Sequence, residues 1–185
     1  MAVLLSSMTA AFIAVTDDDE PVHTRAAMTE NRVEHAVIVT PDGGPLGVLS
    51  MADLRRLGDV TTSFAALADR MPALVVLAAE PDALATAELL DLAELVGRTG
   101  IQSVLLEAGG RPVGVVPRAA LAAAVPLDLL DGRGVRAGDP NVPALRYVCR
   151  RCTPPSFLLL RTPLPDERRP TCRRIFFHGT MEPDS

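Results

Sequence analysis

An internal repeat constrains the fold of this chain more than any other feature of its sequence. Residues 45–49 (PLGVL) align with residues 112–116 (PVGVV), and Gly47 and Gly114 lie 67 residues apart. In both copies a short apolar segment, a glycine-containing turn and a second apolar segment precede a helical pattern, and another helical pattern lies upstream. A unit of this size cannot bury its apolar faces alone, so the two copies are expected to pack on each other. The sequence therefore predicts two βαββα units.

The first copy shows how the pattern translates into structure. Residues 36–39 and 46–49 are short apolar runs typical of buried strands, and residues 41–44 (PDGG) between them favour a turn. Ser50 follows at the position of a helix N-cap, where its hydroxyl can accept a hydrogen bond from a backbone N–H of the next turn. The remaining pattern up to residue 125 predicts these elements: a strand over 11–15, a helix that has the acidic run at 17–20 in its first turn and ends at about Asn31, a helix over 61–70, a strand over 74–77 and a longer helix starting at Pro81.

The composition indicates a globular protein without a membrane segment. Apolar residues make up 48% of the chain and the mean hydropathy is +0.24, with no Trp and one Tyr, so the core must be aliphatic. No run reaches the roughly 18–20 apolar residues that a membrane helix needs. Residues 1–15 are apolar but lack the basic leader of a secretory signal, and an acidic run follows at 17–20. We expect a cytoplasmic protein.

The repeated strand-to-helix pattern resembles a tandem CBS-domain pair, or Bateman module, over residues 6–125. The resemblance implies an α/β fold in which two βαββα repeats pack as a pseudo-two-fold pair. It also implies a homodimer formed through the repeats and clefts that bind adenosine-containing ligands, such as an adenine nucleotide or S-adenosylmethionine.

Residues 47–53 (GVLSMAD) fit the ribose-binding motif of that family: Gly, two apolar residues, Ser or Thr, two further residues and Asp. The resemblance implies that Ser50 and Asp53 contact the ligand and that His35 lies near its phosphate. The chemistry is reasonable, because a carboxylate can accept hydrogen bonds from two vicinal hydroxyls and a helix N-terminus favours a nearby phosphate.

The second copy departs from this motif. Pro117 and Ala120 stand where the hydroxyl and the carboxylate should be, so at most one cleft keeps the ribose-binding half. The residues also have plainer interpretations: Ser50 as a simple N-cap, Asp53 as an acid in the first helical turn, and His35 as a structural histidine. We expect Arg55 and Arg56 on a solvated helix face.

Cys149, Cys152, Cys172 and His178 form a second constellation near the C-terminus. A C-x-x-C turn lets two thiolates bind one ion, and a Cys-x5-His pair about twenty residues later can complete a tetrahedron. A module of about 40 residues with so little apolar content seldom folds without a metal or crosslink. The spacing therefore predicts a zinc-ribbon-like tail with a closed, structural zinc site. The alternatives are a redox pair and unligated core cysteines.

The tail also differs in charge. Residues 1–140 hold 10 Arg against 19 acids, whereas residues 141–185 hold 8 Arg against 4 acids. Positive charge around a zinc–trithiolate site has a structural explanation, since such a site carries a net charge of about −1. Contact with nucleic acid or with a partner protein is an alternative use of the same arginines.

These observations divide the chain into a first repeat (6–60), a second repeat (61–125), a linker (126–144) and the tail (145–185). The predicted function is a non-catalytic regulatory module that senses an adenosine-containing ligand and acts on an effector protein in another chain. The alternative is a ligand-free structural or protein-interaction adaptor. A metal-dependent enzyme is disfavoured because no paired carboxylates, nucleophile elbow or P-loop occurs in the sequence.

Overall fold

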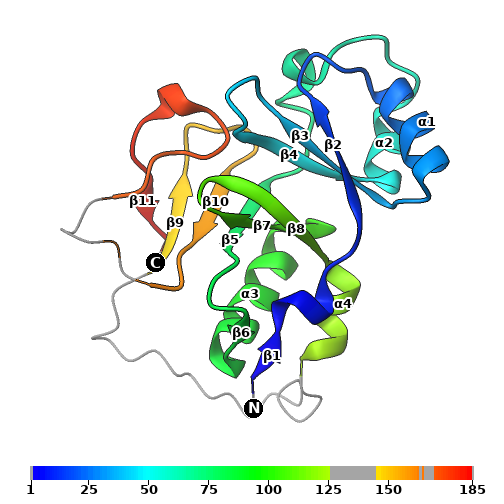
Figure 1. The fold of residues 1–185 in the computed structure, drawn as a ribbon. Coiled ribbons are helices and arrows are strands. Elements are labelled where there is room, and N and C mark those ends of the chain that lie inside the picture. Colours follow the sequence, from blue (N-terminus) through cyan, green and yellow to red (C-terminus); the bar gives the residue numbers. More distant parts are fainter. Residues whose placement is uncertain (1, 126–144, 163, 165–168, 185) are drawn as a thin grey trace.

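A computed structural model describes residues 2–125, 145–162, 164 and 169–184 (Figure 1). The predicted linker at 126–144 lies outside the described residues. Among the described residues, every helix is too short or too polar to cross a lipid bilayer.

The first repeat is a three-stranded sheet covered by two helices. Its sheet has the order β2-β3-β4, with β2 parallel to β3 and β3 antiparallel to β4. The chain enters the first helix through Pro21 at its first position, where the missing N–H costs nothing, and leaves it through Arg32 in the left-handed conformation. The elements are β2 (Phe12–Thr16), α1 (Pro21–Asn31), β3 (His35–Val39), β4 (Pro45–Ser50) and α2 (Met51–Leu57).

The second repeat has the same order of elements, which confirms the predicted duplication. Strand β5 is parallel to β7, and β7 is antiparallel to β8. The two hairpins even share a register irregularity, which falls between Ile38 and Val39 in the first and between Leu106 and Glu107 in the second. The elements are a 3-10 turn η2 (Phe64–Leu67), β5 (Leu74–Ala78), β6 (Ala83–Leu84), α3 (Thr86–Thr99), β7 (Ser103–Ala108), β8 (Arg111–Pro117) and α4 (Arg118–Ala124).

The N-terminal segment packs on the second repeat. Strand β1 (Val3–Leu4) pairs with β6, and the 3-10 turn η1 (Leu5–Met8) follows it. The Ser6 backbone N–H and hydroxyl donate to the Asp82 carboxylate at 2.8 and 2.7 Å, and Ala10 bridges to Val115. Residues before β2 therefore complete the far half of the molecule.

Three predicted helices are shorter than expected. The first begins at Pro21, after the acidic run at 17–20 that was expected to form its first turn. The helix expected to start at Pro81 begins at Thr86, because residues 83–84 are extended and pair with β1. The helix expected over 61–70 is only the 3-10 turn η2. Pairing with β1 keeps residues 83–84 out of the helix, and a short 3-10 turn replaces the helix expected over 61–70.

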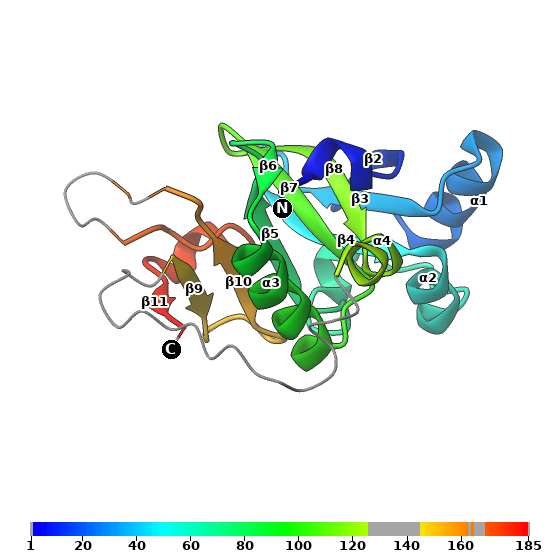
Figure 2. The same ribbon diagram turned by 90° about the horizontal axis from the view of Figure 1, so that it is seen from below.

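The tail extends the sheet of the second repeat. The six strands have the order β11-β9-β10-β5-β7-β8, with β10 parallel to β5 and β9 antiparallel to β10 (Figures 1 and 2). The tail strands are β9 (Arg146–Cys149), β10 (Ser156–Leu159) and β11 (Glu182–Pro183). Most of the apolar run at 157–160 lies in strand β10. The second apolar run, 175–177, enters a 3-10 turn, η4 (Phe176–His178), which is closed by the His178 N–H donating to the Ile175 carbonyl at 3.1 Å.

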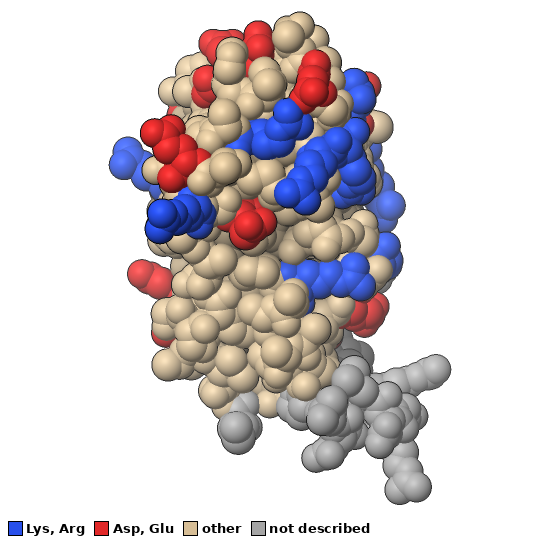
Figure 3. Space-filling model, turned by 90° about the vertical axis from the view of Figure 1, so that its right-hand side faces the viewer, with Lys and Arg blue, Asp and Glu red and all other residues tan. Residues whose placement is uncertain are grey.

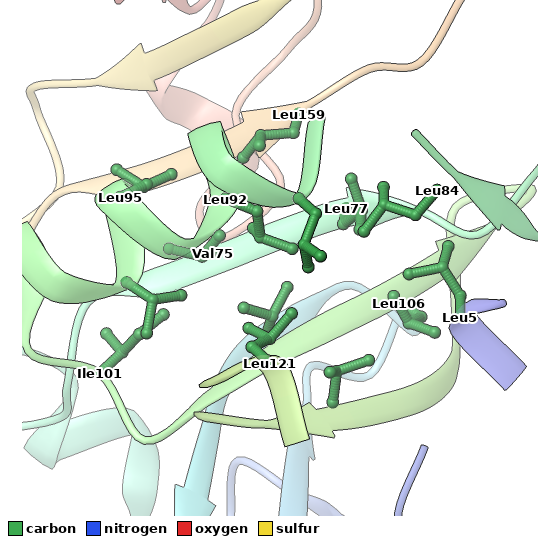
Figure 4. Close-up of a cluster of buried hydrophobic side chains, with 14 of the residues drawn as sticks. Leu5, Val75, Leu77, Leu84, Leu92, Leu95, Ile101, Leu106, Leu121 and Leu159 are labelled. Atoms are coloured by element: carbon green, nitrogen blue, oxygen red, sulfur yellow. The ribbon is translucent and has the colours of Figure 1, made fainter. Parts of the chain in front are cut away.

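The largest hydrophobic cluster lies between α3 and the sheet of the second repeat (Figure 4). Leu92 and Leu95 project from α3 toward Val75 of β5, and Leu121 of α4 closes the cluster from the other side. A central cluster joins Val37 and Val48 of the first repeat to the second repeat and to the tail.

Leu92 gives a direct test of this core. Leu92 is fully buried, so Leu92→Ala should lower the free energy of unfolding by about 2–5 kcal/mol in a urea titration, through lost transfer energy and the cavity left behind. Leu4→Ala is the matched control, because Leu4 is 51% exposed and the same deletion should cost under about 1 kcal/mol. Equal losses in the two variants would contradict this packing.

Candidate metal centre and binding cleft

The three cysteines and His178 meet at one point of the tail. Cys149 ends β9, Cys152 follows three residues later, and η4 carries His178 back toward both. The His178 Nδ1 atom lies 3.6 Å from the Cys149 Sγ and 3.3 Å from the Cys152 Sγ, and the sulfurs of Cys152 and Cys172 are 3.5 Å apart. All four ligand atoms lie within 4.8 Å of one another. Ligands of a tetrahedral zinc ion lie about 3.8 Å apart, so the residues present fit this metal.

The surroundings of the cluster favour a thiolate at Cys172. The three cysteines are free and buried, and a sulfur–sulfur separation of 3.5 Å is far beyond a disulfide bond. The sulfurs of Cys152 and Cys172 share a hydrogen bond, and the backbone N–H of Ile175 donates to the Cys172 Sγ at 3.4 Å. These bonds, the first above all, lower the pKa of the Cys172 thiol to about 5, whereas the bond between the two sulfurs and burial raise the pKa of Cys152. The thiolate is the form that binds a metal.

Two arginines that follow Cys172 attach the cluster to the second repeat. The Arg174 side chain is buried and donates to the carbonyl of Pro154 at 3.0 Å and to the carbonyl of Ala68. Burial lowers the pKa of Arg174, whereas the nearby Cys152 and Cys172 oppose that shift. Arg173 pairs with the buried Glu107 of β7 at 3.2 Å.

These pairs give the basic tail a structural explanation. Arg151 also bonds within the tail, from its Nη1 to the His178 carbonyl at 3.1 Å, whereas Arg168 lies outside the described residues. On the face shown in Figure 3, arginines and acids both lie over the end that carries the first repeat.

The predicted ribose motif folds into a capping box at the start of α2. The Asp53 Oδ2 atom accepts from the Ser50 backbone N–H at 2.8 Å and from the Ser50 hydroxyl at 2.6 Å, and the Asp53 N–H donates to the Ser50 Oγ at 3.2 Å. The other carboxylate oxygen, Oδ1, accepts from Arg56. Asp53 is buried, so these bonds fix its orientation.

Asp53 also lines a cavity of about 290 Å³ that is open to solvent. Arg56 and Leu57 of α2 form one side, and the segments that precede β5 and β7 form the other, through Arg70 to Ala73 and Thr99 to Ile101. We call this cavity the cleft. Its Asp53, Arg56 and Arg70 combine one hydrogen-bond-accepting carboxylate with two cations.

The structure brings the predicted ligand residues together, but only Asp53 of the three is among the residues lining the cleft. His35 of β3 lies opposite Ser50 of β4 in the sheet. Arg56 is 70% exposed, as expected for a solvated helix face, and it also pairs with Asp53 and lines the cleft. The three-residue spacing of Asp53 and Arg56 was the signal for that pair. No local signal marked Arg70.

The corresponding helix of the second repeat lacks such a box. Helix α4 follows Pro117, which provides no side-chain hydrogen bond to the helix N-terminus. Ala120 takes the position of Asp53 in this copy and offers no carboxylate.

His35 is a buried titratable group beside this site. It is 7% exposed, and its Nδ1 atom has no hydrogen-bond partner. Burial lowers the pKa of His35 from its ordinary value of 6.5, while Glu34 and Asp53 partly oppose the shift. The folded protein therefore favours the neutral ring.

Comparisons with known proteins agree with this architecture. Residues 4–59 match the family model of the CBS domain. The CBS domain pair of protein MJ0100, solved in complex with 5′-methylthioadenosine and S-adenosyl-L-methionine, superposes with a TM-score of 0.51 at 13% identity, over 66% of this chain and 95% of that one. The chain therefore has the fold of a CBS domain pair, with a small β region and a Cys3His cluster added at its C-terminus.

Two further solved structures have lower scores. CBSX2 in complex with AMP has a TM-score of 0.46 at 17% identity over 65% of this chain and 94% of that one. OpuCA of Staphylococcus aureus has a TM-score of 0.45 at 18% identity over 64% and 93%. A comparison with curated proteins found no significant match.

The metal centre predicts how much zinc the purified protein contains per chain. The purified protein should contain about one equivalent of zinc per chain, and a chelator should lower its melting temperature because metal binding contributes to folding. His178→Ala should reduce the zinc content, and the matched control His23→Ala should not, because the His23 side chain is 77% exposed and lies outside the Cys3His cluster. Equal zinc content in both variants, or none in the wild type, would contradict the site.

His35 predicts a loss of stability on acidification. A depressed folded-state pKa means that the contribution of His35 is fully present above pH 6.5 and is lost as the pH falls through the folded pKa. His35→Gln should therefore reduce the loss of unfolding free energy that occurs as the pH falls below 6.5. Identical profiles for wild type and His35→Gln would contradict the assignment.

Proposed function

We propose that this protein is a non-catalytic regulatory module that binds an adenosine-containing ligand in the cleft and a structural zinc ion in the tail. The observation that carries the ligand proposal is Asp53, a buried and oriented carboxylate on the wall of a cavity between the two repeats. The MJ0100 domain pair, which shares this fold, binds two adenosine derivatives. An adenine nucleotide or S-adenosylmethionine is therefore the first ligand class to test.

The geometry explains how the carboxylate would bind a ribose. Ser50 occupies Oδ2 from within the capping box, which leaves Oδ1 as the oxygen shared with Arg56. Each carboxylate oxygen has two lone pairs, so Oδ1 can accept a ligand hydroxyl beside Arg56. Because the Arg56 side chain is mostly exposed, it can also turn toward a phosphate of the ligand.

Binding rather than catalysis fits the residues around the cleft. In the described part of the chain, the titratable residues that line the cleft are Asp53 and two arginines, and no second carboxylate or histidine lines it to act as an acid–base partner. A ligand that contacts both repeats would favour one relative arrangement of them. An effector protein or a second copy of the chain would then bind that arrangement of the repeats.

The zinc proposal rests on four protein ligands, because a catalytic zinc ion keeps one position for water. The Arg174 guanidinium beside Cys152 and Cys172 would balance the net charge of about −1 of a zinc–trithiolate–histidine site. The tail is then a clamp whose geometry depends on the metal.

A second candidate function is a structural or interaction adaptor without a ligand. It is favoured by α4, where Pro117 and Ala120 replace the capping box. It is also favoured by Asp53 itself, both oxygens of which already have partners within the chain.

Calorimetric titration separates the two candidates. The wild type should bind at least one of AMP, ADP, ATP and S-adenosylmethionine, and Asp53→Asn should weaken that binding about 10-fold or more, because a charged acceptor is lost. The melting temperature of the variant must be measured in parallel, since the capping box contributes about 1 kcal/mol to stability. Asp18→Asn is the matched control, because Asp18 is exposed in the same repeat and outside the cleft. Absence of binding by the wild type would favour the adaptor.

A further inference from the structure

A second cavity of about 530 Å³ lies beside the cleft, between α3 and the tail. The two cavities share Pro72, Ala73 and Thr99 in their walls, so they adjoin each other, and we call the two together the groove. The far wall comes from the tail, with Arg150, Phe157 and Asp184 among its residues. We call this second cavity the tail compartment.

Arg98 of α3 is held in place on the near wall. Its guanidinium bonds to the Asp184 carboxylate at 2.6 Å and lies 5.8 Å from the centre of the Phe157 ring. Asp184 is buried and is also paired with Arg146 at 2.8 Å. One carboxylate therefore serves two arginines.

Arg150 faces the compartment from the tail and is free to bind a ligand. Its partner is Glu182 at 3.4 Å, but the two side chains are 69% and 62% exposed, and such a surface pair contributes little. Arginine suits phosphate because its planar fork can donate two hydrogen bonds at once. Along the whole groove, four arginines face two aspartates, and both aspartates already accept from arginines: the cations are Arg56, Arg70, Arg98 and Arg150.

We propose that the tail compartment binds the phosphate chain of a nucleoside di- or triphosphate whose adenosine occupies the cleft. This proposal rests on the proposed function for its adenosine half. The tail then does more than clamp the sheet, because Arg150 directly follows Cys149 and its position depends on the metal centre. Zinc binding and recognition of the terminal phosphates become coupled, so each strengthens the other.

Titration of adenosine, AMP and ATP into the zinc-loaded full chain tests the proposal. ATP should bind about 10-fold more tightly than AMP, since each charge-assisted contact to a terminal phosphate adds affinity. Arg150→Gln should bring the ATP affinity close to that of AMP and leave the AMP affinity unchanged. Arg55→Gln is the matched control, because Arg55 is exposed on α2 and lines neither cavity.

Equal affinities for AMP and ATP in the wild type would overturn the proposal while leaving the adenosine site intact, and so would an ATP preference that survives Arg150→Gln. If adenosine and its nucleotides all fail to bind, the proposed function fails, and titration with inorganic pyrophosphate decides the compartment by itself. Pyrophosphate binding that is lost in Arg150→Gln would support an anion site there, and no pyrophosphate binding would overturn it.

Discussion

The parallel pairing of β5 with β10 is the interaction on which the rest of the molecule depends. β5 has β7 on one side, and without the tail its other edge would expose unpaired backbone groups. β10 covers that edge in register from Ser156 opposite Leu74 to Leu159 opposite Leu77. The pairing merges the tail with the sheet of the second repeat and places the tail beside the segment that lines the cleft. The tail has few buried apolar residues of its own, and through this pairing it shares the hydrophobic core of the second repeat.

The cysteines connect this sheet to the first repeat. Cys149, Cys152 and Cys172 lie in the same buried cluster as Val37 and Val48, which come from the other sheet. The sulfurs of the Cys3His cluster are thus part of the contact between the halves of the molecule as well as of the tail. Buried Arg174 and the Arg173–Glu107 pair add directional contacts at the same junction, where an unpaired charge would be costly.

The sequence predicted what depends on local pattern and not what depends on pairing between distant segments. The two hairpins and the capping box follow from turn residues and from a hydroxyl before a helix, and the cysteine spacing anticipated the meeting of four ligand atoms. No local signal shows that residues 156–159 extend the sheet beside β5 or that residues 83–84 are held extended by residues 3–4. Arg98 and Arg150 were missed as groove residues for the same reason, because the tail lies beside α3 only after the sheet has formed.

The crossing of β1 to β6 has a consequence for how the duplicated halves depend on each other. Residues 3–10 precede the first repeat in the chain, yet they contact Asp82, β6 and Val115 of the second. If the chain were cut near residue 60, the first fragment would keep β1 without its partner strand. The second fragment would keep β6 with an unpaired edge. The two repeats are therefore connected by this crossing as well as by their order in the chain. A structural change in either repeat is transmitted to the other through residues 3–10.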